Sequence, residues 1–145
     1  MSALHETSFS LTVLTRKDSV SLKDLEDSRL KVIPVDYESI DSIAAGLRGI
    51  HAVVCAIGSA AIPLQIRIIN AAIKVGVKRF IPSEFGADTF NELSNKLPVY
   101  ASKVAVQKHL QEAADKDQIE WTAIFGGPFL DWGMCQCAFQ FIHIP

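Results

Sequence analysis

Short apolar runs, rich in β-branched and aromatic residues, recur along the chain and predict five β-strands. They occupy residues 11–15, 31–35, 52–57, 79–82 and 121–125. Each run has the length of a strand and is separated from the next by a plausible crossover segment. Strands that alternate with helices form parallel sheets. The pattern therefore predicts an α/β fold built on a parallel sheet.

The segments between these runs predict helices that cover the sheet. Isoleucines at positions 62, 66, 69 and 73 share one helical face, and Pro63 and Gly76 mark where that helix begins and ends. An earlier helix is expected where Ser39 can serve as the N-cap and Gly49 turns the chain. Each helix would bury its apolar face against the sheet.

A polar stretch over residues 83–98 interrupts this regular alternation, and a further helix is predicted over about 99–114. Polar connections of this length carry binding or catalytic residues in many folds. They also occur as mobile surface connections. Composition leaves both interpretations open.

Composition is that of an ordinary globular domain. The chain has 145 residues, 49% of them hydrophobic and 21% charged, and a formal net charge of -2. This length is typical of one domain, and the charges form no block that would attract nucleic acid or a membrane surface. No membrane span or signal peptide is recognisable. We therefore expect a cytoplasmic protein whose partners are small molecules or proteins.

The three cysteines are interpreted as free thiols. Cys55 lies in an apolar run, and Cys135 and Cys137 are two positions apart near the end of the sequence. They are too few and too local for a disulfide framework. A pair of this spacing needs further ligands to hold a metal, and His143 alone does not provide them. The sequence predicts no metal site.

The first strand of a doubly wound nucleotide-binding domain is not recognisable in this sequence. In that fold the strand order is 3-2-1-4-5-6, and the turn after the central first strand carries the fingerprint G-x-G-x-x-G. The eight glycines form no such fingerprint, and only ten residues precede Leu11. The five runs then correspond to strands two to six. We expect a Rossmann-like doubly wound parallel sheet, lacking the first strand and Gly-rich loop, with bare edges and marginal stability.

Four features together resemble the isoflavone reductase-like, NmrA-like family of atypical short-chain dehydrogenases. They are LTVLTRK at 11–17, VGVKRFIPSEFG at 75–86, a lysine on the next helix, and GPFLDWG at 127–133, the last most similar to fungal members. The resemblance covers about residues 9–134. We therefore assign residues 1–134 to a partial NAD(P)-binding domain and residues 135–145 to a divergent C-terminal tail. Family members continue into a substrate-binding region.

Arg16 and Lys17 are the candidate determinants of cofactor choice. They directly follow the first predicted strand, where an arginine accommodates the 2′-phosphate of NADP and an acidic residue favours NAD. A guanidinium can donate two charge-assisted hydrogen bonds to a phosphate. The alternative is a pair of solvated surface cations. We expect NADPH as the cofactor.

The other candidate cofactor contacts follow the later strands. A close approach of the backbone to a dinucleotide is expected after the third run, at Gly58 and Ser59. The resemblance implies that the segment after the fourth run borders the nicotinamide, although a core aromatic and a turn residue are alternatives there. Residues after the fifth run either flank the nicotinamide or simply turn the chain. These two segments contribute Ser83, Glu84, Phe85, Gly127, Pro128 and Phe129.

Lys103 is the candidate catalytic residue. Helical spacing places it on one face with Val106 and Leu110, so we expect it to be partly buried. The resemblance implies that the helix lysine acts as general acid/base, and Lys103 lies at the matching distance after the SEFG segment. An exposed lysine at a helix start is the alternative. Tyr100 is not assigned, because Tyr-x-x-x-Lys needs one more residue between the two.

One further departure concerns the substrate. Plant members often have an arginine four residues after the catalytic lysine, and Gln107 stands there in this chain. The lone polar residues Gln65 and His109 are interpreted as structural or solvated. Plant phenylpropanoid substrates are therefore not expected.

These observations lead to three hypotheses. The first is an NADPH-dependent reductase acting on an aromatic or conjugated small molecule, with Lys103 managing the proton. The second is a non-catalytic NAD(P)-binding regulator that binds a protein partner. The third is an inactive truncated product. Lys103 favours the first, because a sensor does not require a proton-transfer residue.

Overall fold

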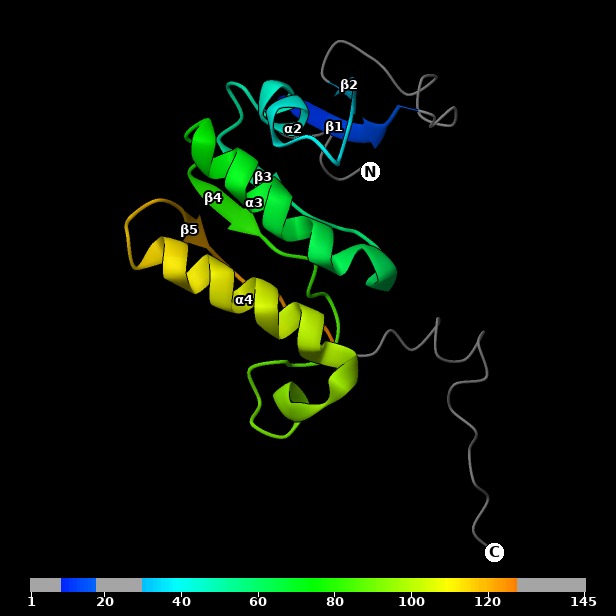
Figure 1. Cartoon of the computed structure of the whole chain (residues 1–145), viewed down its shortest axis with the longest axis vertical. Coiled ribbons are helices and arrows are strands. Elements are labelled where there is room, and N and C mark those ends of the chain that lie inside the picture. The colour runs from blue at the N-terminus through cyan, green and yellow to red at the C-terminus, as the bar shows by residue number, and fades with distance from the viewer. Residues whose placement is uncertain (1–8, 18–29, 128–145) are drawn as a thin grey trace, which may run out of the picture.

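The computed structural model describes residues 9–17 and 30–127. The elements follow in the order β1 (Leu11–Arg16), β2 (Leu30–Val35), α2 (Ile40–Gly46), β3 (Ala52–Val54), a 3-10 helix (Ser59–Leu64), α3 (Gln65–Lys74), β4 (Arg79–Ile81), two 3-10 turns (Ser94–Lys96 and Pro98–Tyr100), α4 (Ala101–Ala114) and β5 (Glu120–Trp121). Figure 1 traces this path. The strand pairs are parallel. The predicted α/β fold is confirmed.

The strands form two separate sheets. β1 pairs with β2, whereas β4 lies between β3 and β5. In the doubly wound order, β2 and β1 occupy the first two positions and β3, β4 and β5 the last three. No described residue occupies the central position between β1 and β3, so each of these strands has an unpaired edge within the described part of the chain. This is the arrangement that the sequence predicted.

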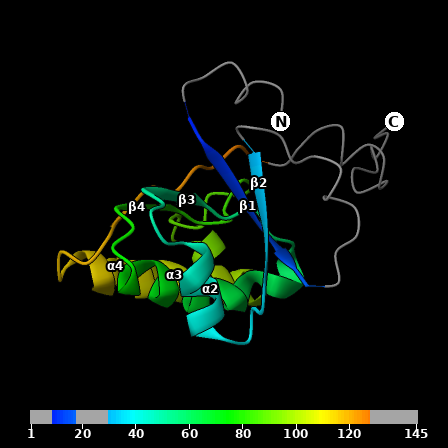
Figure 2. The same cartoon turned by 90° about the horizontal axis from the view of Figure 1, so that it is seen from above.

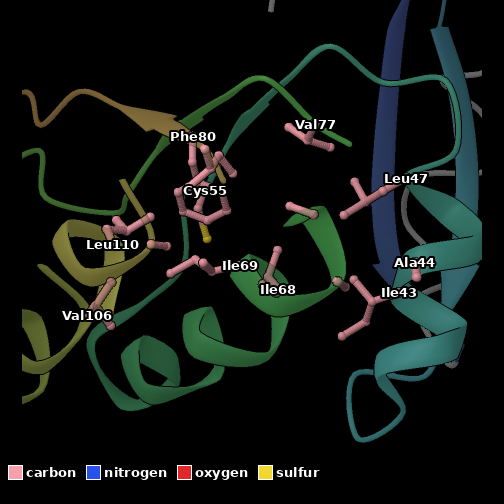
Figure 3. Packing of buried hydrophobic residues seen from close by; sticks show 14 of the residues in the cluster. Ile43, Ala44, Leu47, Cys55, Ile68, Ile69, Val77, Phe80, Val106 and Leu110 are labelled. Carbon is pink, nitrogen blue, oxygen red and sulfur yellow. The ribbon is translucent and has the colours of Figure 1, made fainter. Parts of the chain in front are cut away.

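A single hydrophobic core connects both parts. The helices α2, α3 and α4 lie on one side of the strands (Figure 2). Phe80 of β4 is fully buried, and Ile69 of α3 and Leu110 of α4 point toward it (Figure 3). The same cluster includes Ile43, which lies in α2, and Leu47, which directly follows that helix. The α2 helix itself follows the β1–β2 sheet. Packing of α2 beside α3 therefore connects the two sheets without strand pairing.

Local signals explain the start of α2 and the end of α3. The Ser39 hydroxyl accepts a hydrogen bond from the backbone N–H of Ser42 at 3.2 Å, as expected of an N-cap. Gly76 has a φ of +77°, a conformation that glycine adopts without strain, and it follows α3. The start of α3 differs from the prediction. Pro63 lies in the preceding 3-10 helix, and the α-helix begins at Gln65.

The last strand is shorter than predicted and lies earlier in the chain. The apolar run predicted a strand over residues 121–125, whereas β5 contains only Glu120 and Trp121. Arg79 and Phe80 of β4 stand opposite these two residues. Because β4 itself has only three residues, it offers few backbone groups for a longer partner. The described chain beyond β5 therefore lies largely outside the ladder.

The thiol of Cys55 is buried and free. Burial raises its pKa to about 12, because an apolar environment disfavours the thiolate. This agrees with the interpretation of Cys55 as a free thiol. Cys135 and Cys137 lie outside the described residues.

Candidate functional site

Two adjoining hollows, of about 460 and 330 Å³, lie where β3 and β4 end and α4 begins. Both are lined by Ser59, Ile62, Phe85 and Lys103. Ligands of open α/β sheets bind at the carboxyl ends of the strands. Six residues predicted from the sequence line one or both hollows: Gly58, Ser59, Ser83, Phe85, Lys103 and Gly127. We call the combined hollow the strand-end pocket.

Ser83 joins the ends of β3 and β4. Its hydroxyl donates to the carbonyl of Ile57 at 2.9 Å and accepts from the N–H of the same residue at 3.1 Å. The backbone N–H of Ser83 donates to the side-chain oxygen of Gln65 at 2.8 Å. These bonds hold the floor of the strand-end pocket after the strand ladder has ended.

Gln65 was not predicted as part of this site. Its side chain is buried, and its amide nitrogen donates to the carbonyl of Ile62 at 3.4 Å. Although a lone glutamine on a helix is usually solvated, position 65 is three residues after Ile62 and four before Ile69. It therefore lies on the apolar face of α3, and this spacing was the available signal.

Lys103 is half-buried in the wall of the strand-end pocket. Its side chain is 17% exposed, and its Nζ donates to the backbone carbonyl of Glu84 at 2.6 Å. The same Nζ lies 3.3 Å from carboxylate oxygen Oε2 of Glu84. The sequence predicted a partly buried lysine on the face of α4 that contains Val106 and Leu110, and both of those residues are fully buried.

Glu84 lies beneath the pocket and does not line it. Its side chain is 1% exposed. Oε1 accepts from the amide of Gln107 at 2.8 Å, and Oε2 accepts from the hydroxyl of Thr89 at 3.1 Å. The Gln107 amide also donates to the Thr89 hydroxyl. Glu84, Lys103, Thr89 and Gln107 form a closed polar group, which we call the Glu84 cluster.

The backbone turns sharply after Glu84. Phe85 has a φ of +30°, which is uncommon for a residue with a side chain. A Cβ on Gly86 would lie 3.4 Å from the carbonyl oxygen of Glu84. The N–H of Gly127, which has a φ of +71°, donates to the carbonyl of Gly86 at 3.0 Å. The segment after β5 is thus fastened to the turn after β4.

The two predicted cofactor determinants on β1 do not line the strand-end pocket. Arg16 ends β1, and Lys17 lies 3.6 Å from the carboxylate of Asp36 in an exposed ion pair. The hydroxyl of Tyr37 donates to the carbonyl of Leu14 at 3.0 Å. Burial raises the pKa of Tyr37, although the nearby Arg16 cation acts in the opposite direction. Arg16 is therefore near the carboxyl end of its own sheet.

Several predictions have no counterpart in the described residues. Pro128 and Phe129 lie outside them, as does the proposed tail at 135–145.

Within residues 9–17 and 30–127, no group of three or more histidine, cysteine or acidic side chains could hold a metal ion. The same part of the chain contains no helix long and apolar enough to cross a membrane.

Comparisons with known proteins agree with this geometry. The chain is 39% identical over 127 residues to Oxidoreductase aprR of Aspergillus flavus. This match covers 85% of this chain and 41% of that protein. It is 31% identical over 134 residues to Oxidoreductase poxI of Penicillium oxalicum, covering 91% of this chain and 41% of that protein. The chain thus spans about two fifths of the length of these relatives.

Solved structures with a similar fold contain the expected cofactor. The leucoanthocyanidin reductase–NADPH complex of Vitis vinifera is 28% identical, with a TM-score of 0.66, and the match covers 79% of this chain and 40% of that one. AtPrR2 with NADP+ and (+)pinoresinol has a TM-score of 0.71 at 23% identity, over 86% and 44% of the two chains. Residues 1–131 match the NmrA-like family. This chain therefore belongs to the NmrA-like family, with isoflavone reductase-like homologues among its relatives.

Proposed function

We propose that the chain carries the reductase site of an NADPH-dependent enzyme that acts on an aromatic or conjugated small molecule. The observation that carries this proposal is the position of Lys103, half-buried in the wall of a pocket at the carboxyl ends of β3 and β4. We also propose that the protein is cytosolic. The relatives are named oxidoreductases, and the leucoanthocyanidin reductase structure contains NADPH.

The pocket residues fit a dinucleotide in one specific respect. Gly58 lines the pocket, and a Cβ built on it would meet no atom within 4 Å. The backbone there is open to close approach by a ligand. When bound, NADPH supplies a hydride; Ser59 and Phe85 would border it, and Lys103 would supply the proton. Neighbouring Ser83 holds the floor through its bonds to Ile57.

The direct test is consumption of NADPH by the purified chain, followed by absorbance, with a panel of conjugated aromatic acceptors. We expect acceptor-dependent oxidation and a reduced product that mass spectrometry identifies. Saturable NADPH binding without turnover of any acceptor would instead indicate a regulator. The absence of both NADPH binding and turnover would contradict both functions.

Arg16 is proposed to select NADPH over NADH. We expect Arg16→Ala to weaken NADPH binding by about tenfold or more, because a hydrogen bond to a charged group contributes ~1.5–3 kcal/mol. NADH binding should change little, since NADH lacks the 2′-phosphate. Calorimetric titration with both nucleotides measures the difference.

Arg67→Ala is the matched control for this experiment. Arg67 is an exposed arginine of α3 that pairs with Glu38 at 2.6 Å and does not line the pocket. Its substitution should leave both affinities unchanged. An equal loss of NADPH and NADH binding in Arg16→Ala would argue against recognition of the 2′-phosphate.

A further inference from the structure

The Glu84 cluster contains one negative and one positive side chain in a nearly closed environment. Both polar contacts described for Lys103 Nζ are made to Glu84, one to its carbonyl and one to its carboxylate. Among the ion pairs of the described residues, neither Lys103 nor Glu84 has another partner of opposite charge. The two charges therefore depend on each other.

Hydrogen-bond donors surround the carboxylate of Glu84. An amide nitrogen can only donate, and the Gln107 amide donates to Oε1. The Thr89 hydroxyl accepts from Gln107 and so has its own proton free to donate to Oε2. Each carboxylate oxygen accordingly accepts a hydrogen bond. A buried carboxylate with such donors and an adjacent cation is held in a fixed orientation.

The anion in turn acts on Lys103. The carboxylate at 3.3 Å and the carbonyl at 2.6 Å both attract Nζ, and loss of these contacts would leave Glu84 buried without its counter-charge. An uncompensated buried charge is strongly unfavourable. The side chain is also held at its end, so Nζ has a fixed place beside the pocket.

We propose that Glu84 is a positioning residue that holds the Nζ of Lys103 at a fixed place beside the strand-end pocket, with Thr89 and Gln107 fixing the carboxylate. The proposal rests on the proposed function for its chemical meaning: Lys103 begins each turnover as a proton donor. As hydride adds to the acceptor carbon, the displaced electron pair forms a bond to a proton from Nζ. The Nζ–H bond breaks, and the resulting neutral amine regains a proton from solvent.

Amine acylation of the folded chain tests this proposal without cofactor or turnover. Nζ must leave its contacts with Glu84 to react, so the extent of labelling at a fixed mildly alkaline pH reports how firmly the side chain is held. Peptide mass spectrometry gives the labelling of Lys103 relative to Lys78, which is exposed. In Glu84→Gln we expect this ratio to rise about tenfold, because the glutamine side chain has no charge to hold Nζ. An unchanged ratio would overturn the proposal.

Glu112→Gln is the matched control. Glu112 lies 4.0 Å from Lys108 on the exposed side of the same helix and is not part of the Glu84 cluster. This substitution makes the same chemical change, and the ratio should stay within about twofold of the unsubstituted chain, because exposed pairs contribute little. A rise as large as in Glu84→Gln would show that the labelling does not report the buried pair.

Labelling of the buried Cys55 by a thiol reagent shows whether each variant is folded. If the Glu84→Gln variant does not fold, the double variant Glu84→Gln/Lys103→Met tests the pairing of the two side chains, because it removes both charges together. A folded double variant supports the pairing, and an unfolded one overturns it. Labelling needs no substrate, so a chain that shows the acylation shift but no NADPH turnover would contradict the proposed function alone.

Discussion

Replacing Lys103 with alanine is expected to lower NADPH-dependent turnover by about 10²–10⁴-fold, the usual contribution of a positioned proton-transfer group. Lys103 lies in the wall of the strand-end pocket, and alanine has no group to replace Nζ. NADPH affinity should change little, because the proposed role concerns the proton. Steady-state kinetics together with NADPH titration separate the two effects. Unchanged turnover in this variant would refute the assignment.

Lys103→Arg provides the sharper comparison for the same residue. Alanine leaves the Glu84 carboxylate buried without its cation, which also costs stability. Arginine keeps a positive charge next to Glu84 but does not release a proton at ordinary pH. We expect Lys103→Arg to remain folded and to be nearly as inactive as Lys103→Ala. An active arginine variant would indicate that charge alone is needed.

Replacing Phe80 with alanine is expected to destabilise the fold by about 3–5 kcal/mol, the range observed for large aromatic residues in cores. Phe80 has no exposed surface and lies between α3 and α4 on the central strand of its sheet. Natural domains have ~5–15 kcal/mol of stability, so this loss would unfold a substantial fraction of a marginal one. Urea unfolding followed by circular dichroism measures it.

Phe90→Ala is the control for Phe80. Phe90 is 54% exposed and makes edge-on contacts with Trp121 and Phe125, with ring centroids 5.9 and 5.1 Å apart. Such pairs contribute about 0.5–1.5 kcal/mol beyond the area that they bury. We therefore expect a clearly smaller loss than for Phe80. Equal losses would show that β4 is not the centre of the core.

The fold could be predicted from the sequence because local patterns of apolar residues identify its strands and helices. The apolar run around Phe80 and the isoleucine spacing before Gly76 each identify one element without reference to the rest of the chain. The unpaired edges that β1 and β3 have within the described residues were predicted as well, from the glycine pattern and the known strand order. The end of β5 was not predicted correctly, because the length of this strand depends on how far β4 extends as its partner.

The site was less predictable, since its contacts join residues that are far apart in sequence. Nothing local to Gln107 indicates that its amide reaches Glu84, which is 23 positions away. Glu84 was selected as a cofactor contact, but its burial below the pocket and its bonds to Lys103 could not be predicted. Lys103 itself could be selected because helical spacing predicted its partial burial. Its ion-pair partner required the three-dimensional arrangement.

Titration of the purified chain with NADPH tests the central claim most directly, because the proposed reductase and a dinucleotide-binding regulator both require the site. The account predicts saturable binding with a dissociation constant below about one millimolar, a free energy of roughly -4 kcal/mol. Binding of NADPH should be tighter than binding of NADH, and Arg16→Ala should remove the difference. Absence of saturable binding in this range would contradict the account.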